Sequence, residues 1–311
     1  MSDNWSAVGW QGVSLRVPPD WNLVGVNGDV HKGYFRVDSP ENASVEVRWS
    51  VLQQEPTDLS SRGEEFLGSM RKTAKKRKIQ FSGKVKSRKP TQAEQLHGGG
   101  SVSFTWRADR SGHGRLSYCG CCKRLVIAQV VGDVGRDMSG LAAQILGSIC
   151  SHEEPGWNEW ALYDLHVAVP ERFKLAKHTL MSSFVELEFK DRRERMIIQR
   201  WGLAANTLLK KQSLEEWMDG TYLPGVTGYR TDSTRIEGSE HEEFQFKGRR
   251  RGIHRAVLAL GKTLVKAKPL PRFVEGRTWY CDETNRIYAI RHYFGREGGL
   301  VDVLRRKTAC H

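Results

Sequence analysis

The chain has 311 residues, of which 39% are hydrophobic and 27% are charged, so it contains enough apolar material for two domains of ordinary size. The N-terminus has no basic segment followed by an apolar run, and no stretch of about 18 apolar residues occurs, so we expect a cytoplasmic protein without a signal peptide or membrane insertion. The formal charge of +13 favours acidic partners, namely an acidic protein, nucleic acid or an anionic membrane surface.

The first strands of the chain occur twice. Residues 12–49 match residues 163–201 at an offset of 152, so that Pro18 matches Pro170. Ahead of each proline apolar and polar residues alternate, which predicts a strand that has one buried face and ends at the proline. Both segments end in an Arg-Trp pair, at residues 48–49 and 200–201. Successive strand residues point to opposite faces, so we expect Trp inward and Arg outward rather than an exposed cation-π platform.

A helix follows the first strands in each copy. In the first copy it is predicted over residues 57–78, with Thr57 or Asp58 as N-cap. Its apolar residues share one face, as an amphipathic helix requires: Leu59, Phe66, Leu67 and Met70. In the second copy the corresponding helix is expected near residues 213–222, with Ser213 as cap.

A second motif lies in the later half of each copy. GRLSYCGCCKRL, from Gly114, recurs as GRTWYCDETNRI, from Gly276, at an offset of 162. Each motif precedes a β-rich run, a turn and a helical segment that ends in cysteine and histidine. We therefore predict an α+β fold of two tandem homologous domains, residues 1–152 and 153–311, each a mainly antiparallel sheet packed with helices.

This order of elements resembles the PsbP-like fold, an α/β/α sandwich also found in a Ran-binding nuclear protein and in the bacterial DcrB family. The resemblance rests on the element order and on the pentapeptides VPPDW (17–21) and VPERF (169–173). It implies that each half is one such domain and that the protein has a binding or assembly role, because members of this fold are typically accessory proteins. It carries over no functional residue.

The cysteines of the first motif raise the question of a metal site. If the closing helix runs antiparallel to the strand after Cys119, its end returns toward the start of that strand. A structural zinc ion would then be held by Cys119, Cys121 or Cys122, Cys150 and His152. Two alternatives stay open: the cysteines are small apolar residues of the core, or Cys119 forms a disulfide with Cys150.

Two segments are basic and contain no acidic residue, namely residues 71–89 and 247–272. Such segments can neutralise phosphates and bind nucleic acid in a salt-dependent way. The alternative is a solvated helix end followed by an edge strand that lysines protect. The candidate nucleic-acid-binding residues are Arg71, Lys72, Lys75, Lys76, Arg77, Lys78, Lys84, Lys86, Arg249, Arg250, Arg251 and Arg255. The neighbouring aromatics are expected in the core: Trp106, Tyr118, Trp279 and Tyr280.

Catalytic motifs do not emerge from the sequence. HEEF, from His241, lacks the second histidine of a metalloprotease helix, and neither a phosphate loop nor a nucleophile elbow is found. We therefore expect a non-enzymatic binding or scaffold protein with an acidic protein partner. The alternative is a nucleic-acid-binding protein that uses the basic segments, and a third class is an enzyme with its active site between the halves.

Overall fold

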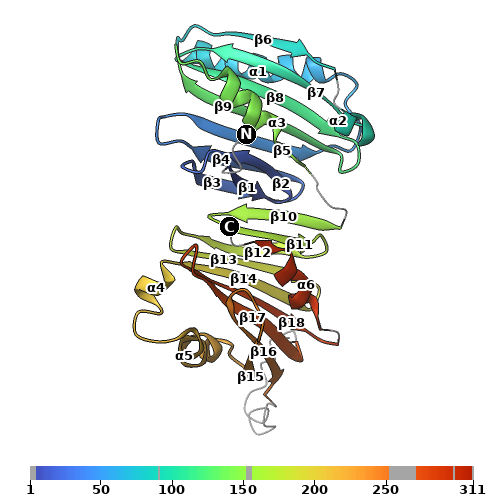
Figure 1. Cartoon of the computed structure of the whole chain (residues 1–311). Helices are drawn as coiled ribbons and strands as arrows, with labels where there is room; N and C mark the ends of the chain where they lie inside the picture. Colours follow the sequence, from blue (N-terminus) through green and yellow to red (C-terminus); the bar gives the residue numbers. More distant parts are fainter. Residues whose placement is uncertain (1–4, 90–91, 152–155, 252–270, 297, 310–311) are drawn as a thin grey trace, which may run out of the picture. The chain divides into compact units, whose positions relative to one another are not determined.

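The computed structural model describes residues 5–89, 92–151, 156–251, 271–296 and 298–309. The chain divides into two compact units, Met1–His166 and Val167–His311 (Figure 1). No described helix is long and apolar enough to cross a membrane.

A seven-stranded sheet forms the body of the first unit, in the order β3-β4-β5-β9-β8-β7-β6. Its strands are β3 (Asn22–Gly28), β4 (Lys32–Asp38), β5 (Ser44–Val51), β6 (Ser82–Ser87), β7 (Gly100–Arg107), β8 (Arg110–Cys119) and β9 (Arg124–Asp133). All neighbouring pairs are antiparallel. The sheet is therefore antiparallel throughout, as the alternating apolar pattern predicts.

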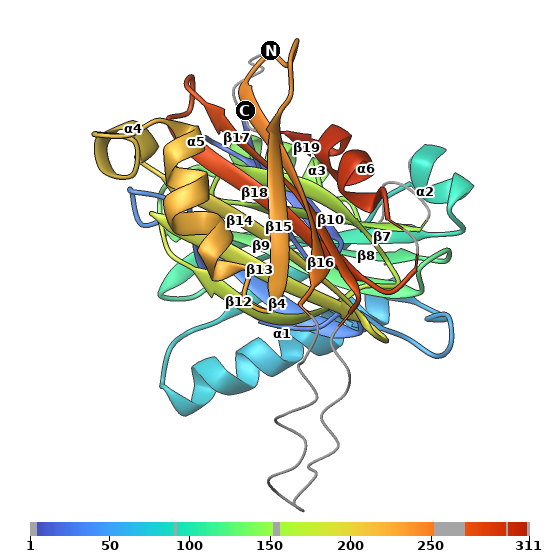
Figure 2. The ribbon, with the colours of Figure 1, turned by 90° about the horizontal axis from the view of Figure 1, so that it is seen from below.

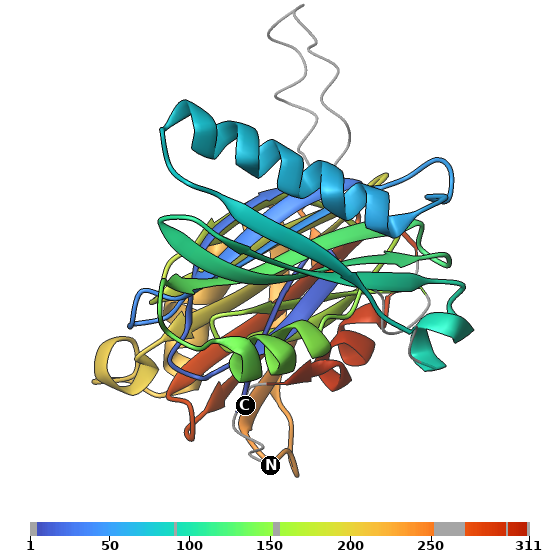
Figure 3. The same cartoon turned by 90° about the horizontal axis from the view of Figure 1, so that it is seen from above.

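Helices cover parts of both faces of this sheet (Figure 3). On one face α1 (Leu59–Lys76) packs on β6, β7 and β8, and on the other α3 (Ser139–Gly147) packs on β8 and β9. The short α2 (Gln92–Leu96) lies beside β7. Asp58 caps α1 by accepting from the backbone N–H groups of Ser60 and Ser61, and Leu67 is fully buried. The predicted first helix is thus confirmed with its cap.

A smaller set of strands completes the first unit. Here β1 (Ser6–Trp10) pairs with β2 (Val13–Val17) on one side and with β10 (Trp157–Leu162) on the other. The rings of Trp10 and Trp160 meet edge to face at 5.0 Å, and both side chains are buried. The segment after residue 152, which we assigned to the second domain, therefore supplies a strand to the first unit.

The second unit contains a sheet of the same design, in the order β12-β13-β14-β18-β17-β16-β15. Its strands are β12 (Lys174–Leu180), β13 (Phe184–Asp191), β14 (Glu194–Gly202), β15 (Tyr229–Arg235), β16 (Glu242–Arg250), β17 (Phe273–Cys281) and β18 (Arg286–Phe294). β11 (Leu165–Pro170) precedes them and contains the unit boundary, and β19 (Thr308–Ala309) closes the described chain. Strand for strand this order equals that of the first sheet, as a duplication requires.

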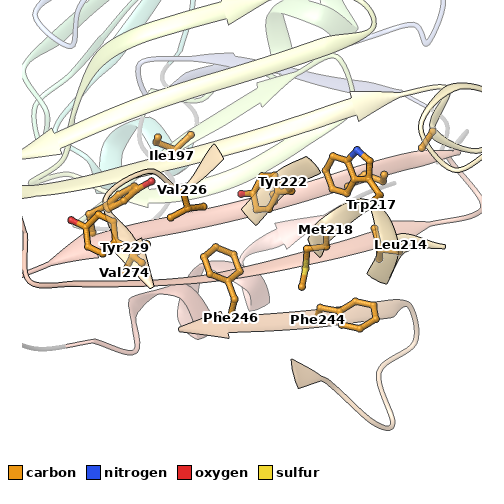
Figure 4. Close-up of a cluster of buried hydrophobic side chains, with 14 residues drawn as sticks. Ile197, Leu214, Trp217, Met218, Tyr222, Val226, Tyr229, Phe244, Phe246 and Val274 are labelled. Carbon is orange, nitrogen blue, oxygen red and sulfur yellow. The ribbon is translucent and has the colours of Figure 1, made fainter. Parts of the chain in front are cut away.

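Helical segments again cover both faces (Figure 2). On one face lie α4 (Ala204–Thr207), α5 (Leu214–Trp217), the π-helix η1 (Met218–Tyr222) and the 3-10 helix η2 (Leu223–Gly225). α6 (Leu300–Arg306) packs on β17 and β18 from the other face. Ser213 and Glu216 form a reciprocal capping box at the start of α5, so the second predicted cap is also confirmed. Figure 4 shows the apolar cluster that α5 and η1 build with the sheet.

The Gly-Arg start of the repeated motif has the same structural role in both units. A Cβ on Gly114 would lie 2.0 Å from Cζ of Phe104, and one on Gly276 would lie 2.3 Å from Cζ of Phe246, so each glycine makes room for a ring on the neighbouring strand. The arginines that follow bind carboxylates: Arg115 pairs with Glu94 at 2.5 Å and Arg277 with Glu243 at 2.8 Å.

The two Arg-Trp pairs differ between the units. Trp49 is 2% exposed and the Arg48 side chain 61% exposed, as predicted. In the second unit the prediction is wrong, because Arg200 is 1% exposed and Trp201 is only half-buried. Trp49 pairs with Val126 whereas Trp201 pairs with Ile287, the counterpart of Leu125 in the motif. The strand register thus differs by one residue from the sequence match, which places the two tryptophans on opposite faces.

Candidate functional site

The first basic segment forms one continuous exposed surface in the first unit. It comprises the last turns of α1, the turn that follows and the edge strand β6. All eight predicted residues are exposed: Arg71, Lys72, Lys75, Lys76, Arg77, Lys78, Lys84 and Lys86. We call this set the α1–β6 basic surface.

The charges of the α1–β6 basic surface flank the free edge of β6 on both faces of the sheet. Val85 points toward α1, since a Cβ on Gly63 would lie 3.0 Å from its methyl group, so Lys84 and Lys86 point to the opposite face. On the α1 side the guanidinium of Arg71 lies over the ring of Phe81, 5.8 Å from its centre. The backbone edge of β6 therefore runs between two rows of cations.

Few acidic groups neutralise this surface. Arg77 lies 3.7 Å from Asp109, and both side chains are more than half exposed, so this ion pair contributes little. Among the described residues the other seven cations have no ion-pair partner. Arg88 is different: it points inward, bonds the hydroxyl of Ser101 and pairs with Glu94 at 3.0 Å. Arg88 thus supports the fold, whereas the α1–β6 basic surface is available to a partner.

The second basic segment belongs to the second unit and is described in part. Arg249 and Arg250 end β16, Arg251 follows them, and all three are exposed. Arg249 lies opposite Arg230 on β15. Arg255 and the rest of residues 252–270 lie outside the described residues, so the predicted second surface is described only at its start.

The proposed zinc ligands are only partly within the described structure. Cys119 ends β8, and the adjacent turn carries Cys121, whose Sγ lies 3.5 Å from Nδ1 of His97. A hydrogen bond with Cys119, together with burial, raises the pKa of the Cys122 thiol. Cys150 pairs through its backbone with Ser14.

No disulfide joins the described cysteines, so the alternative of a Cys119–Cys150 disulfide is wrong, and Cys281 is buried. Within the described ranges no group of three or more His, Cys, Asp or Glu side chains is placed to hold a metal ion. His152 lies outside these ranges, so the zinc site stays a prediction. The aromatics near the basic segments lie as expected in two cases, since Tyr118 and Trp279 are buried.

Sequence reasoning missed a groove on the α1 face of the first sheet, beyond the strands that α1 covers. Its volume is about 400 Å³. It is lined by Asn27, Gly28, Lys32, Gly33, Tyr34, Arg48, Trp49, Ser50, Leu125 and Ile127. The floor is apolar, two cations stand at its rim, and no carboxylate lines it. The guanidinium of Arg48 lies over the ring of Tyr34, 5.5 Å from its centre. Because the lining residues come from four strands, no local sequence motif predicts the groove.

Comparisons with known proteins add little. No family model matches the chain, and no curated protein sequence matches it. Two solved structures are similar over 96% of this chain and 90% of theirs, each with a TM-score of 0.30. One is described as the Tle4-Tli4 complex, at 13% identity. The other is described as the immunity protein TplEi of T6SS from Pseudomonas aeruginosa complexed with an "L" peptide, at 14% identity. Similarity at this level carries no functional argument.

Proposed function

We propose that this is a non-enzymatic binding protein whose first unit captures an extended acidic segment of a partner protein along the edge of β6. The observation that carries the proposal is the α1–β6 basic surface, in which seven of eight exposed cations lack an ion-pair partner among the described residues. The PsbP-like resemblance, with its implied accessory role, stays a prediction that agrees with this function.

The exposed backbone of the edge strand β6 is the second feature that would bind the partner segment. An edge strand offers a row of backbone N–H and C=O groups to an added strand. Side chains of that added strand would alternate between the two faces of the sheet. On one face they would meet Lys84 and Lys86, and on the other they would approach Arg71 and Lys75. Acidic side chains on either face would therefore find cations within reach.

The same features favour a polypeptide over nucleic acid. Single-stranded nucleic acid is held by exposed aromatic rings as well as by cations. Here the nearest tryptophan, Trp106, stacks on Phe81 at 6.3 Å and donates from its indole to Gln129. Both rings are half-buried. They pack against each other within the unit and are not free to stack on bases. The backbone edge of β6, in contrast, offers N–H and C=O groups in the spacing that another peptide strand matches.

Two peptides of equal charge test this proposal. One is the ten-residue (Glu-Thr)5, and the other carries N-methyl groups on its four central backbone amides, two of which would face β6 in either register. We expect the N-methylated peptide to bind the full chain at least about tenfold more weakly, since two backbone hydrogen bonds of about 1 kcal/mol each are lost. Fluorescence anisotropy at two salt concentrations measures both affinities. Equal affinities would show that charge alone binds and would contradict strand addition.

Charge reversal tests where the peptide binds. The test variant replaces three cations of the α1–β6 basic surface by glutamate: Lys75, Lys84 and Lys86. The control makes the same change at three exposed lysines of the second unit: Lys174, Lys177 and Lys210. Only the first variant is expected to lose (Glu-Thr)5. If single-stranded DNA binds the native chain more tightly than (Glu-Thr)5 and the first variant loses it, the nucleic-acid alternative replaces the proposal.

A further inference from the structure

The groove of the first unit has a counterpart in the second unit. Within the shared strand order, the row Lys32, Ser50 and Leu125 across β4, β5 and β9 corresponds to the row Phe184, Trp201 and Ile287 across β13, β14 and β18. The next row, Tyr34, Arg48 and Ile127, corresponds to Glu186, Gln199 and Ala289. These residues of the groove can therefore be compared one by one with their equivalents in the second unit.

In the second unit the chain itself covers these positions. Trp201 meets Trp217 of α5 edge to face at 5.2 Å and Tyr222 of η1 at 5.8 Å. Trp217 and Tyr222 stack on each other at 5.5 Å, and both are buried. Figure 4 shows both rings lying on the sheet. A short helical segment with two aromatic side chains therefore closes this face.

In the first unit the corresponding connection takes a different course. After β5 the chain leads to α1, which packs on β6, β7 and β8, so that none of the described helices packs on β4 or β5 to a similar extent. Ser50 stands where Trp201 stands in the second unit, and Lys32 stands where Phe184 stands. The volume that rings fill in one unit is the open groove of the other.

We infer that this groove receives a short helical segment of a partner protein that carries an aromatic side chain flanked by acidic residues. The aromatic side chain would lie on the apolar floor, against Leu125 and Ile127. The acidic flank follows from the rim, where Lys32 and Arg48 stand without a carboxylate among the lining residues. Glu46 approaches Arg48 only to 3.9 Å. This inference is independent of the α1–β6 basic surface, since the groove uses none of its residues.

The second unit also supplies the probe. Its own covering segment, residues 213–222, has the sequence SLEEWMDGTY, which combines two rings with three acidic residues. We would label this peptide and measure its binding to the full chain by fluorescence anisotropy. A control peptide carries serine at both aromatic positions and keeps the charge. The native peptide is expected to bind at least about tenfold more tightly than the control.

Two variants of the full chain locate the site. Ser50→Trp places an indole in the groove where the second unit has Trp201, and it is expected to weaken peptide binding at least about tenfold. Ser103→Trp, at a half-buried serine of β7, is the matched control and should bind as the native chain does. Thermal unfolding of both variants verifies that they are folded. No peptide binding, equal binding of the two peptides, or undiminished binding by Ser50→Trp would each overturn the inference.

Discussion

At the scale of single residues, the repeated Gly-Arg pair shows what the two copies preserve. Gly114 and Gly276 each lie under an aromatic ring of the neighbouring strand, Phe104 in one unit and Phe246 in the other. A ring that covers a glycine shields the backbone and fixes the register of the strand pair. The motif is therefore structural, and its repetition is explained without a catalytic or binding role.

Replacing one of these glycines should be costly. In Gly276→Ala the new Cβ would lie 2.3 Å from the ring of Phe246 and 2.6 Å from the carbonyl oxygen of Ile290. Because a backbone oxygen cannot move aside easily, we expect the free energy of unfolding to fall by about 1–3 kcal/mol. Gly68→Ala in α1 is the control, since nothing lies within 4 Å of its Cβ; it should be neutral or stabilising by up to about 1 kcal/mol. Urea denaturation measures both, and an unaffected Gly276→Ala would refute the steric argument.

The Arg-Trp pairs show that matching the two copies by sequence does not always predict which residues occupy equivalent positions in the structure. Sequence identity aligns Trp49 with Trp201, but strand pairing aligns Ser50 with Trp201. A shift of one residue moves every side chain to the other face of a sheet. Sequence alone could not detect this shift, because the sequence match aligns the two identical Arg-Trp pairs and the shift is seen only in the pairing with β9 and β18. The shift places Ser50 rather than a tryptophan beside the groove, so sequence matching gave no sign of it.

At the scale of elements, α6 lacks a side-chain N-cap of the usual kind. Gly299 occupies the cap position with φ of 91° and has no side chain that could accept from the backbone N–H groups of the first turn. Glu275 of β17 takes this role, since its carboxylate accepts from the backbone N–H of Gly299 at 2.7 Å and of Val301 at 3.5 Å. Nδ1 of His292, on β18, lies 3.7 Å from the same oxygen of the carboxylate. One carboxylate thus joins the helix start to two strands.

This arrangement predicts a pH-dependent contribution to stability. Burial alone would raise the pKa of Glu275, but the nearby His292 and the hydrogen bonds from the backbone N–H groups of Gly299 and Val301 outweigh it and lower the pKa below its ordinary 4.5. A carboxylate whose pKa is lower in the folded state stabilises the protein above the ordinary value, and this stabilisation is lost as the pH falls through the folded-state pKa.

Glu275→Gln measures the contribution of this carboxylate. We expect the free energy of unfolding to fall by about 1 kcal/mol at pH 7, because the amide oxygen of glutamine still accepts these hydrogen bonds but carries no charge. The difference from the native chain should shrink as the pH falls below 4.5, because the unfolded chain then takes up a proton that the folded carboxylate, with its lower pKa, resists. Glu64→Gln, on the exposed side of α1, is the control and should leave the free energy of unfolding unchanged at both pH values. A difference that stays constant from pH 7 to pH 3 would contradict the role of the charge.

Elements with a local signal were predictable. Asp58 and Ser213 cap their helices as expected, because an N-cap is determined by residues within one turn. The course of the connection after β5 could not be predicted in the same way, because packing against distant strands decides whether a helix covers β6 or β9. The exposure of the α1–β6 basic surface could be predicted from its composition, but its position on both sides of an edge strand required the sheet order.

At the scale of the whole molecule, the repeated motifs predicted two units that share one strand order, and the sheets have that order. The domain boundary is where sequence and structure differ. The repeat places residues 153–166 with the second copy, whereas contacts place them in the first unit. Sequence similarity between the copies reflects their common origin, whereas the pairing of strands is determined by which side chains become buried. β10 pairs with β1 because Trp160 and Trp10 bury each other there.

Two fragments distinguish these boundaries. Residues 1–166 keep β10, whereas residues 1–152 end at the repeat boundary and leave Trp10 and the edge of β1 uncovered. Deleting a buried tryptophan side chain usually costs about 3–5 kcal/mol, so we expect the shorter fragment to unfold at least about 3 kcal/mol more easily in urea, with Trp10 exposed to quenchers. A Trp160→Ala exchange within the longer fragment isolates the ring contact from the strand and should reproduce much of the loss. If both fragments unfold at the same urea concentration, β10 contributes nothing to the first unit and the repeat boundary is the folding boundary.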